Sequence, residues 1–379
     1  MATRTARPLH DASLSLLPLP ALALTSLVWW QWCGSLGGIG VLATGFNATL
    51  DLLFLLTGWR TAHDALVPGR TSALVLLRRA ALRFLPMHLV LLVLSVACAL
   101  AFRAEGYSLI GSVPFVDGLS LAANLLLVHG WFPAGMFLNF WNPHLWIFGA
   151  GLFWLQIAPF VVRGFGRGLA RGMAPWMLAL AVWGAALAVT LVAWVLIPTD
   201  IIDVKGRLWF FLGFPPMRLW EFSLGALLRL ASDAPLRTGG FRDRLESKRL
   251  RWIAVPALLV AIVLVVASPL DLLGGDSGWV VSQPLLVAPL WGMLLFVLAR
   301  ENVPVPHWLV WAGWASVPVM IFSPWAFWCA VALRQAGLAI ELPILFLLVA
   351  FGSGGVLHWG IFMPVRKWCD RRWPCSRTH

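Results

Sequence analysis

Charged residues are scarce in this chain, and that scarcity limits the folds open to it. Asp, Glu, Lys and Arg make up only 12% of the 379 residues, about half of their usual share in soluble domains. Hydrophobic residues make up 60%, and the mean hydropathy is +0.84. A water-soluble globule of this length still needs a polar shell. The composition therefore argues against a soluble fold and indicates a membrane protein.

The sequence also lacks the short, alternating apolar segments that are typical of membrane β-strands. Its apolar runs are continuous and about twenty residues long, which is the length that an α-helix needs to cross a bilayer. Because backbone polar groups must pair with one another inside lipid, these runs predict an all-α, polytopic integral membrane protein. We expect about ten transmembrane helices, at 18–42, 46–59, 84–102, 144–162, 174–197, 212–230, 252–269, 282–299, 308–331 and 338–362.

No internal repeat, low-complexity segment or long linker divides the sequence, so we expect a single membrane domain over residues 1–379 that ends in a basic tail at 363–379. The N-terminal run continues to about Leu42 without a clear cleavage site, and we interpret it as a retained first helix. The apolar segment 119–128, inside the stretch 107–130, is too short to cross. It predicts an interfacial or re-entrant piece.

Acidic residues are few, and the formal net charge is +12. The basic residues gather in every second predicted loop, at 60–83, 163–171 and 229–251, and again in the tail. Basic loops remain in the cytoplasm, so both termini are expected on the cytoplasmic side of the inner (plasma) membrane. Excess positive charge is also typical of nucleic-acid binding. In a chain this apolar it fits contact with lipid headgroups better, and we expect no nucleic-acid partner.

The five cysteines lack the spacing of a metal site. Cys33, Cys98 and Cys329 fall in apolar runs, where a free thiol is ordinary. Cys369 and Cys375 lie in the basic tail, in a compartment where disulfides are rare. We therefore expect no metal and no bound cofactor.

Ionisable residues inside the predicted membrane helices are rare, and such groups are default functional candidates. Asp51 lies in the second predicted helix, His144 opens the fourth, and His358 lies in the last. Arg218 and Glu221 are three residues apart, so they share one helix face and can pair. Structural alternatives remain open: an ion pair that fixes helix packing, a cap or backbone contact for Asp51, a cap or headgroup contact for His144, and packing for His358.

Five segments together resemble the membrane O-acyltransferases of acyltransferase family 3. They are Asp51-Leu-Leu-Phe-Leu-Leu-Thr57-Gly58-Trp59, Arg78-Arg79-Ala-Ala-Leu-Arg83-Phe-Leu-Pro86-Met-His88, His144-Leu-Trp146 followed by Pro159, Arg218-Leu-Trp-Glu221-Phe-Ser-Leu-Gly225-Ala, and Pro364-Val-Arg366-Lys367-Trp368. The resemblance extends from about residue 45 to residue 368.

The resemblance implies transfer of an acetyl or other short acyl group from acyl-CoA, as a co-substrate, to an exported polysaccharide or glycan. It also implies polysaccharide-synthesis proteins as partners. The candidate catalytic residues are His144, Glu221 and His88. The candidate residues for binding the donor or the acceptor are Asp51, Arg79, Arg83, Trp146 and Arg218. The basic 60–83 loop fits the donor's phosphates, and it equally fits topology and headgroup contact.

Departures from the family pattern keep a second function open. The family's first helix carries an Arg and a catalytic His, yet no His or Arg occurs between His10 and Arg60. Neutral residues also replace ionisable ones at Gly151, Ser323 and Phe362. The alternative is a catalytically silent relative that binds or translocates a glycan or acyl carrier, or that assists assembly of an envelope polysaccharide. A secondary transporter has less support, because no inverted half-repeats are visible.

Overall fold

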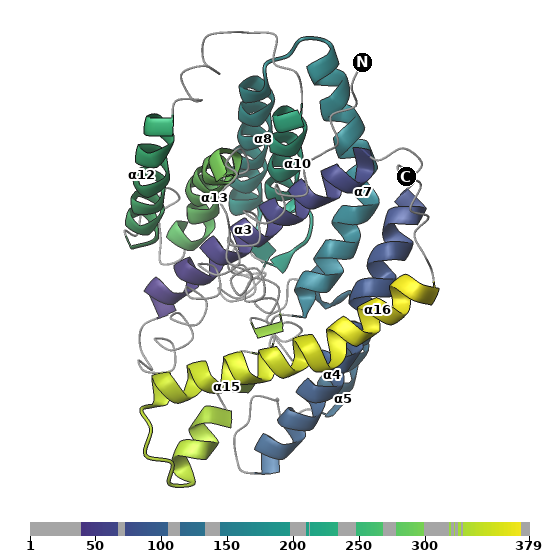
Figure 1. The fold of residues 1–379 in the computed structure, drawn as a ribbon, viewed down its shortest axis with the longest axis vertical. Coiled ribbons are helices and arrows are strands. Elements are labelled where there is room, and N and C mark those ends of the chain that lie inside the picture. Colours follow the sequence, from purple (N-terminus) through teal and green to yellow (C-terminus); the bar gives the residue numbers. More distant parts are fainter. Residues whose placement is uncertain are drawn as a thin grey trace.

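Every secondary-structure element that the computed structural model describes is helical, which agrees with the expected all-α class (Figure 1). The described residues are 39–66, 73–104, 114–132, 145–197, 210–211, 213–233, 248–267, 278–298, 318–319, 322, 325–326 and 329–372. The elements are α3 (Ile39–Leu66), α4 (Ala73–Ala104), α5 (Pro114–Leu125), η1 (His129–Trp131), α7 (Trp146–Ala170), α8 (Pro175–Leu196), α10 (Leu219–Asp233), α12 (Lys248–Ala267), α13 (Gly278–Leu298), α15 (Leu342–Val356), η2 (Leu357–Phe362) and α16 (Met363–Arg372).

Three helical stretches are long and apolar enough to cross a membrane by length and composition. They are Trp146–Ala170, Pro175–Leu196 and Ile344–Val365. They overlap the fourth, fifth and last helices that the sequence predicts. Shorter apolar helical stretches lie within three further predicted helices, at Leu85–Cys98, Ile253–Val265 and Ser282–Leu298.

Helix α8 presents a continuous apolar surface to the outside. Trp176 is 64% exposed, Val192 57% and Val195 76%. A single exposed apolar side chain is normal on a soluble protein, but a whole apolar helix face in water is not. The surface of α8 therefore fits lipid, which agrees with the bilayer as a partner.

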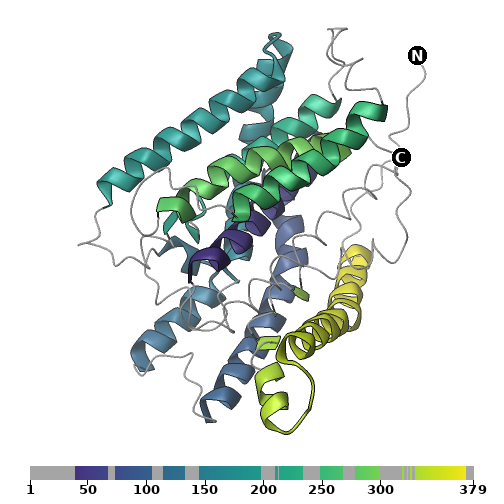
Figure 2. The same cartoon turned by 90° about the vertical axis from the view of Figure 1, so that its left-hand side faces the viewer.

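Helix α3 runs diagonally through the middle of the bundle (Figures 1 and 2). It packs most extensively against α10, then against α13, and it also touches α7 and α12. Its buried residues Leu52, Leu55 and Trp59 share one apolar cluster with Trp291 and Leu294 of α13. Apolar packing on several sides makes α3 the central element of the described fold.

The contact between α3 and α10 depends on two glycines that face each other's helix. A Cβ atom added at Gly58 would lie 1.9 Å from the carbonyl oxygen of Phe222, and one added at Gly225 would lie 2.0 Å from that of Leu55. Neither distance leaves room for a methyl group. Small residues at a crossing point let two backbones approach closely, as in other membrane helix pairs.

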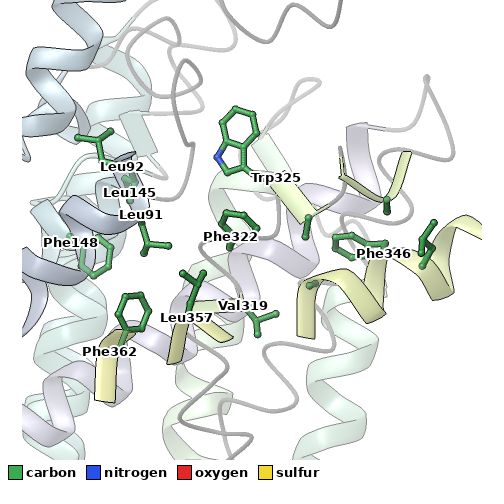
Figure 3. Packing of buried hydrophobic residues seen from close by; sticks show 14 of the residues in the cluster. Leu91, Leu92, Leu145, Phe148, Val319, Phe322, Trp325, Phe346, Leu357 and Phe362 are labelled. Atoms are coloured by element: carbon green, nitrogen blue, oxygen red, sulfur yellow. The ribbon is translucent and has the colours of Figure 1, made fainter. Parts of the chain in front are cut away.

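A second apolar cluster joins the C-terminal helices to α4 and α7 (Figure 3). The cluster contains Leu91 of α4, Phe148 of α7, Phe346 of α15 and Phe362 of η2. Trp325 is buried there, and its indole N–H donates a 2.9 Å hydrogen bond to the hydroxyl oxygen of Ser95. The cluster thus links segments that are more than 200 residues apart in the chain.

Two predicted helix boundaries near the N-terminus are wrong. The second helix was expected at 46–59, but α3 has 28 residues and begins at Ile39. Residues 39–42, assigned to the first predicted helix, therefore belong to α3, and residues 18–38 of that helix lie outside the described residues. Gly40 and Gly45 do not interrupt α3, because each glycine costs a helix only about 1 kcal/mol, which packing overrides.

The basic segments predicted as loops are partly helical. Helix α7 continues through the whole of 163–170, and α3 and α4 extend into the predicted 60–83 loop from both ends. Arginine is a good helix former, so a basic segment does not by itself end a helix.

At the C-terminus the helical region runs without a break from Leu342 through η2 to Arg372, so most of the expected basic tail at 363–379 is helix α16. The last helix begins at Leu342 and not at 338, after a turn at Gly337 with a φ of 95°. Most of the predicted helix 308–331 lies outside the described residues. The predicted interfacial segment 119–128 overlaps the short helix α5, which begins at Pro114.

The substitution Gly58→Ala is expected to destabilise the protein by at least about 2 kcal/mol, because α3 and α10 must move apart to admit the methyl group. The matched control is Gly151→Ala in α7, where an added Cβ meets nothing within 4 Å. The control is expected to be neutral or stabilising by up to about 1 kcal/mol. Thermal unfolding of the purified variants in detergent measures both, and equal stability of the two would contradict the close helix contact.

Candidate functional site

Arg218 projects from a turn just ahead of α10. The sequence predicted a helix from 212, but α10 begins at Leu219 and residues 215–218 form a turn. Pro215 and Pro216 explain the difference, because proline lacks a backbone N–H and restricts the residue before it. Arg218 and Glu221 still pair as expected, although the arginine lies outside the helix.

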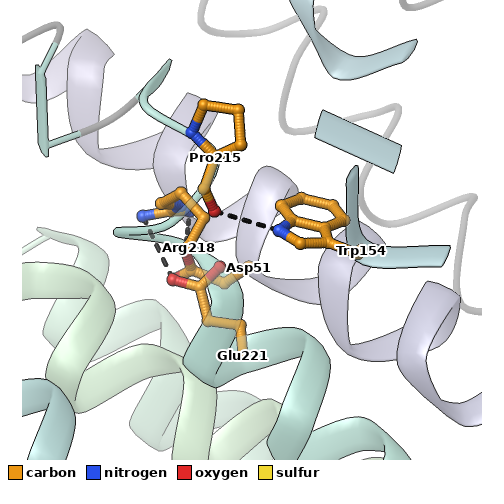
Figure 4. A network of polar contacts seen from close by, with 5 residues as sticks. All are labelled: Asp51, Trp154, Pro215, Arg218 and Glu221. Atoms are coloured by element: carbon orange, nitrogen blue, oxygen red, sulfur yellow. Dashed lines mark hydrogen bonds and ion pairs between the residues drawn. The ribbon is translucent and has the colours of Figure 1, made fainter. Parts of the chain in front are cut away.

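Asp51, Arg218 and Glu221 form a buried ionic cluster (Figure 4). The Arg218 Nη2 group donates a 2.6 Å hydrogen bond to Asp51 Oδ1, and its Nη1 atom lies 3.2 Å from Glu221 Oε1. The two carboxyl side chains are 0% exposed and the guanidinium side chain 2%. The sequence predicted the pairing of Arg218 with Glu221 but not that of Arg218 with Asp51. That ion pair joins α3 to the start of α10.

Aromatic side chains form the walls of the ionic cluster. The Arg218 guanidinium carbon lies 5.0 Å from the centre of the Phe54 ring. The Phe54 ring is in turn 4.5 Å from Trp154 and 5.9 Å from Trp146, both by edge contacts. The Trp154 indole donates a 3.0 Å hydrogen bond to the Pro215 carbonyl, which fixes the turn that carries the arginine (Figure 4).

The ionic cluster holds two carboxyl groups against one guanidinium group. Charges this deeply buried cost several kcal/mol each in lost hydration, and only close pairing offsets that cost. Either carboxylate alone suffices to neutralise Arg218. The arginine, in contrast, is the one cation in contact with both acids in the described residues.

A small pocket lies beside the ionic cluster. Its volume is about 10 Å³, which is room for roughly one water molecule. The pocket is lined by Thr190, Phe211, Met217, Arg218, Trp220, Pro284 and Leu285. A space this small, as formed by the described residues, holds neither an acyl chain nor a sugar.

His88 lies on the other side of α7 from the ionic cluster. Residues Trp146, Ala150 and Trp154 on one face of α7 pack with Phe54, whereas Phe148 on another face meets the His88 ring at 5.6 Å. The His88 Nε2 atom is hydrogen-bonded at 2.9 Å to the Asn124 carbonyl oxygen. The structure therefore does not bring this candidate base to Asp51, Arg218 and Glu221.

His129 is a buried histidine that the sequence did not single out. It is 0% exposed in η1. Burial, with a further contribution from His88, lowers the pKa of His129 to about 3, so its ring is neutral at physiological pH. No sequence signal could have found it, because the helical turn that buries it has no distinctive pattern.

The other predicted site residues have different positions. Trp146 is fully buried beside Phe54. Arg79 and Arg83 lie on α4, and their side chains fall outside what the structure describes, as does His144. His358 is buried and its ring meets Trp359 at 5.4 Å, as expected for a packing residue.

Comparison of the chain with protein-family models, with curated proteins and with solved structures found no match.

The substitution Arg218→Met is expected to destabilise the protein by about 3–5 kcal/mol, because it leaves two buried carboxyl groups without a cation. The control is Arg229→Met within α10, whose guanidinium lies half-buried 5.6 Å from the Trp59 ring. A contact of that kind contributes about 0.5–2 kcal/mol. Thermal unfolding in detergent compares the two, and a smaller loss for Arg218→Met than for Arg229→Met would count against the buried ionic cluster.

Proposed function

We propose that this chain is a membrane-bound O-acyltransferase that transfers a short acyl group from acyl-CoA to a hydroxyl of an exported polysaccharide or glycan. One observation carries the proposal. Asp51, Trp146 and the Arg218–Glu221 pair come from three of the five segments that resemble acyltransferase family 3, and they meet around one buried cluster. Convergence of these segments on one polar centre is what a shared catalytic scaffold requires.

The proposal includes the full topology that the sequence predicts. About ten transmembrane helices would cross the inner (plasma) membrane, with both termini in the cytoplasm. Three helices long and apolar enough to cross support this arrangement. The donor would then approach from the cytoplasm and the glycan acceptor from the outer side.

In the proposed reaction the acceptor hydroxyl attacks the thioester carbonyl of acyl-CoA. The new C–O bond forms, the C–S bond breaks, a base takes the hydroxyl proton, and the coenzyme leaves as a thiolate that is then protonated. A positioned base contributes roughly a hundredfold or more to such a step. We assign the base to His144, which lies two positions before Trp146 in the chain. The buried ionic cluster would position α3 and α10 around the reacting groups.

A catalytically silent relative is the second candidate, and a specific observation favours it. Asp51 and Glu221 are fully buried against Arg218, so neither carboxyl group is exposed to take a proton from an acceptor hydroxyl. His88 lies across α7 from this cluster. Such a protein would bind or translocate a glycan or an acyl carrier, or assist assembly of an envelope polysaccharide, without transferring the acyl group.

The test is acyl transfer by the purified chain in lipid vesicles, with isotope-labelled acetyl-, propionyl- and butyryl-CoA and a glycan acceptor. Wild type is expected to esterify the glycan, and His144→Gln to lower the rate at least about a hundredfold, since it removes the assigned base. The matched control His88→Gln is expected to retain the wild-type rate within a few-fold. Mass spectrometry of the recovered glycan measures the ester.

Retention of glycan binding without transfer from any of the three donors would favour the silent relative and contradict the acyltransferase. Transfer that is unchanged in His144→Gln would remove His144 from the mechanism while leaving the activity established.

A further inference from the structure

A row of arginines runs along one face of the last turns of α7 and ends at the C-cap of the helix. Arg163, Arg167 and Arg171 follow one another at intervals of four residues, and all three side chains are exposed. At about 100° per residue, this spacing keeps them within one side of the helix. The opposite side, with Val162 and Leu169, packs against α3 and α10. The arginine row therefore points away from the bundle.

The surface around the arginine row is open and positively charged. A Cβ added at Gly164 or Gly166 would meet nothing within 4 Å. The chain contains no acidic residue between Asp117 and Asp200, so no neighbour in sequence compensates the three positive charges. Fixed arginines of this kind pair with phosphate oxygens, often through two hydrogen bonds at once.

An exposed apolar surface begins directly beyond the arginine row. The chain turns at Gly172, whose φ is 84°, and α8 starts at Pro175. Met173 is 40% exposed, Trp176 64% and Leu180 56%. The turn lies at the upper end of the α7–α8 pair in Figures 1 and 2. The arginine row and the apolar surface next to it together match a molecule that has an anionic headgroup and adjoining hydrocarbon chains.

We propose that the hairpin of α7 and α8 binds an anionic phospholipid. Its phosphate would pair with Arg163, Arg167 and Arg171, and its acyl chains would lie along the exposed face of α8 beside Trp176. Both α7 and α8 are among the helices long and apolar enough to cross a membrane. The row of arginines then lies where the hydrocarbon ends and headgroups begin, and tryptophan favours the same depth. The inference rests on membrane insertion and is independent of acyl transfer.

The test is native mass spectrometry of the purified full chain in neutral detergent, with phosphatidylglycerol and phosphatidylcholine that carry the same acyl chains. Wild type is expected to bind phosphatidylglycerol more tightly. The affinity of the double variant Arg163→Gln/Arg167→Gln for phosphatidylglycerol is expected to fall roughly tenfold to thirtyfold. Each basic residue near an anionic headgroup contributes roughly a three- to fivefold gain in affinity, and the variant removes two of them.

The matched control is Lys367→Gln/Arg371→Gln on α16, which removes the same charge from two exposed residues with the same spacing. It is expected to keep the wild-type affinity within about twofold, because the proposed lipid lies on α7 and α8. Circular dichroism checks that each variant keeps its helices, and single substitutions at Arg163 and Arg167 replace the double variant if it aggregates.

Equal losses in the two double variants would show a general charge effect and overturn the site. Equal binding of phosphatidylcholine would overturn the preference for an anionic headgroup. Displacement of the lipid by an equal concentration of glycerophosphoglycerol, which has the headgroup without the chains, would show a phosphate site and overturn the lipid assignment.

Discussion

The arrangement of the described helices depends on one guanidinium group held between two carboxyl groups in the middle of the bundle. Arg218 reaches Asp51 on α3 and Glu221 on α10 from a turn that two prolines create. These buried charges have lost their hydration and are stabilised only by pairing with one another. Separating α3 from α10 would therefore expose or unpair them at a cost of several kcal/mol. The glycines at 58 and 225 bring the two backbones close enough to keep the pair sealed.

The sequence predicts the helical class and the pairing of Arg218 with Glu221, because apolar length and a spacing of three residues are local properties. The contact of Arg218 with Asp51 joins residues 167 positions apart, and no local pattern encodes it. Two errors arose, one from placing the start of the second helix too late at 46 and one from treating Arg163 as a loop residue. In both places tertiary packing extends a helix beyond the point where composition changes. The burial of His129 depends on a turn that only the folded chain defines.

The functional interpretation follows from what burial allows. A carboxyl group with no exposed surface does not meet a substrate, so Asp51 and Glu221 fit positioning roles better than direct contact with a glycan or a thioester. The resemblance to acyltransferase family 3 and the convergence of three of its segments favour a catalytic scaffold. The missing first-helix histidine and the separation of His88 from the ionic cluster favour a silent relative. The exposed arginines of α7, in contrast, are free of such burial and fit a ligand at the membrane surface.

The most direct test of the buried ionic cluster is the stability of Asp51→Asn, Glu221→Gln and the double variant, measured by unfolding in detergent. Each single variant is expected to lose at most about 1 kcal/mol, because the remaining carboxylate still neutralises Arg218. The double variant leaves the buried cation unpaired and is expected to lose about 3–5 kcal/mol, well beyond the sum. Losses that simply add would contradict a cluster in which two acids share one arginine.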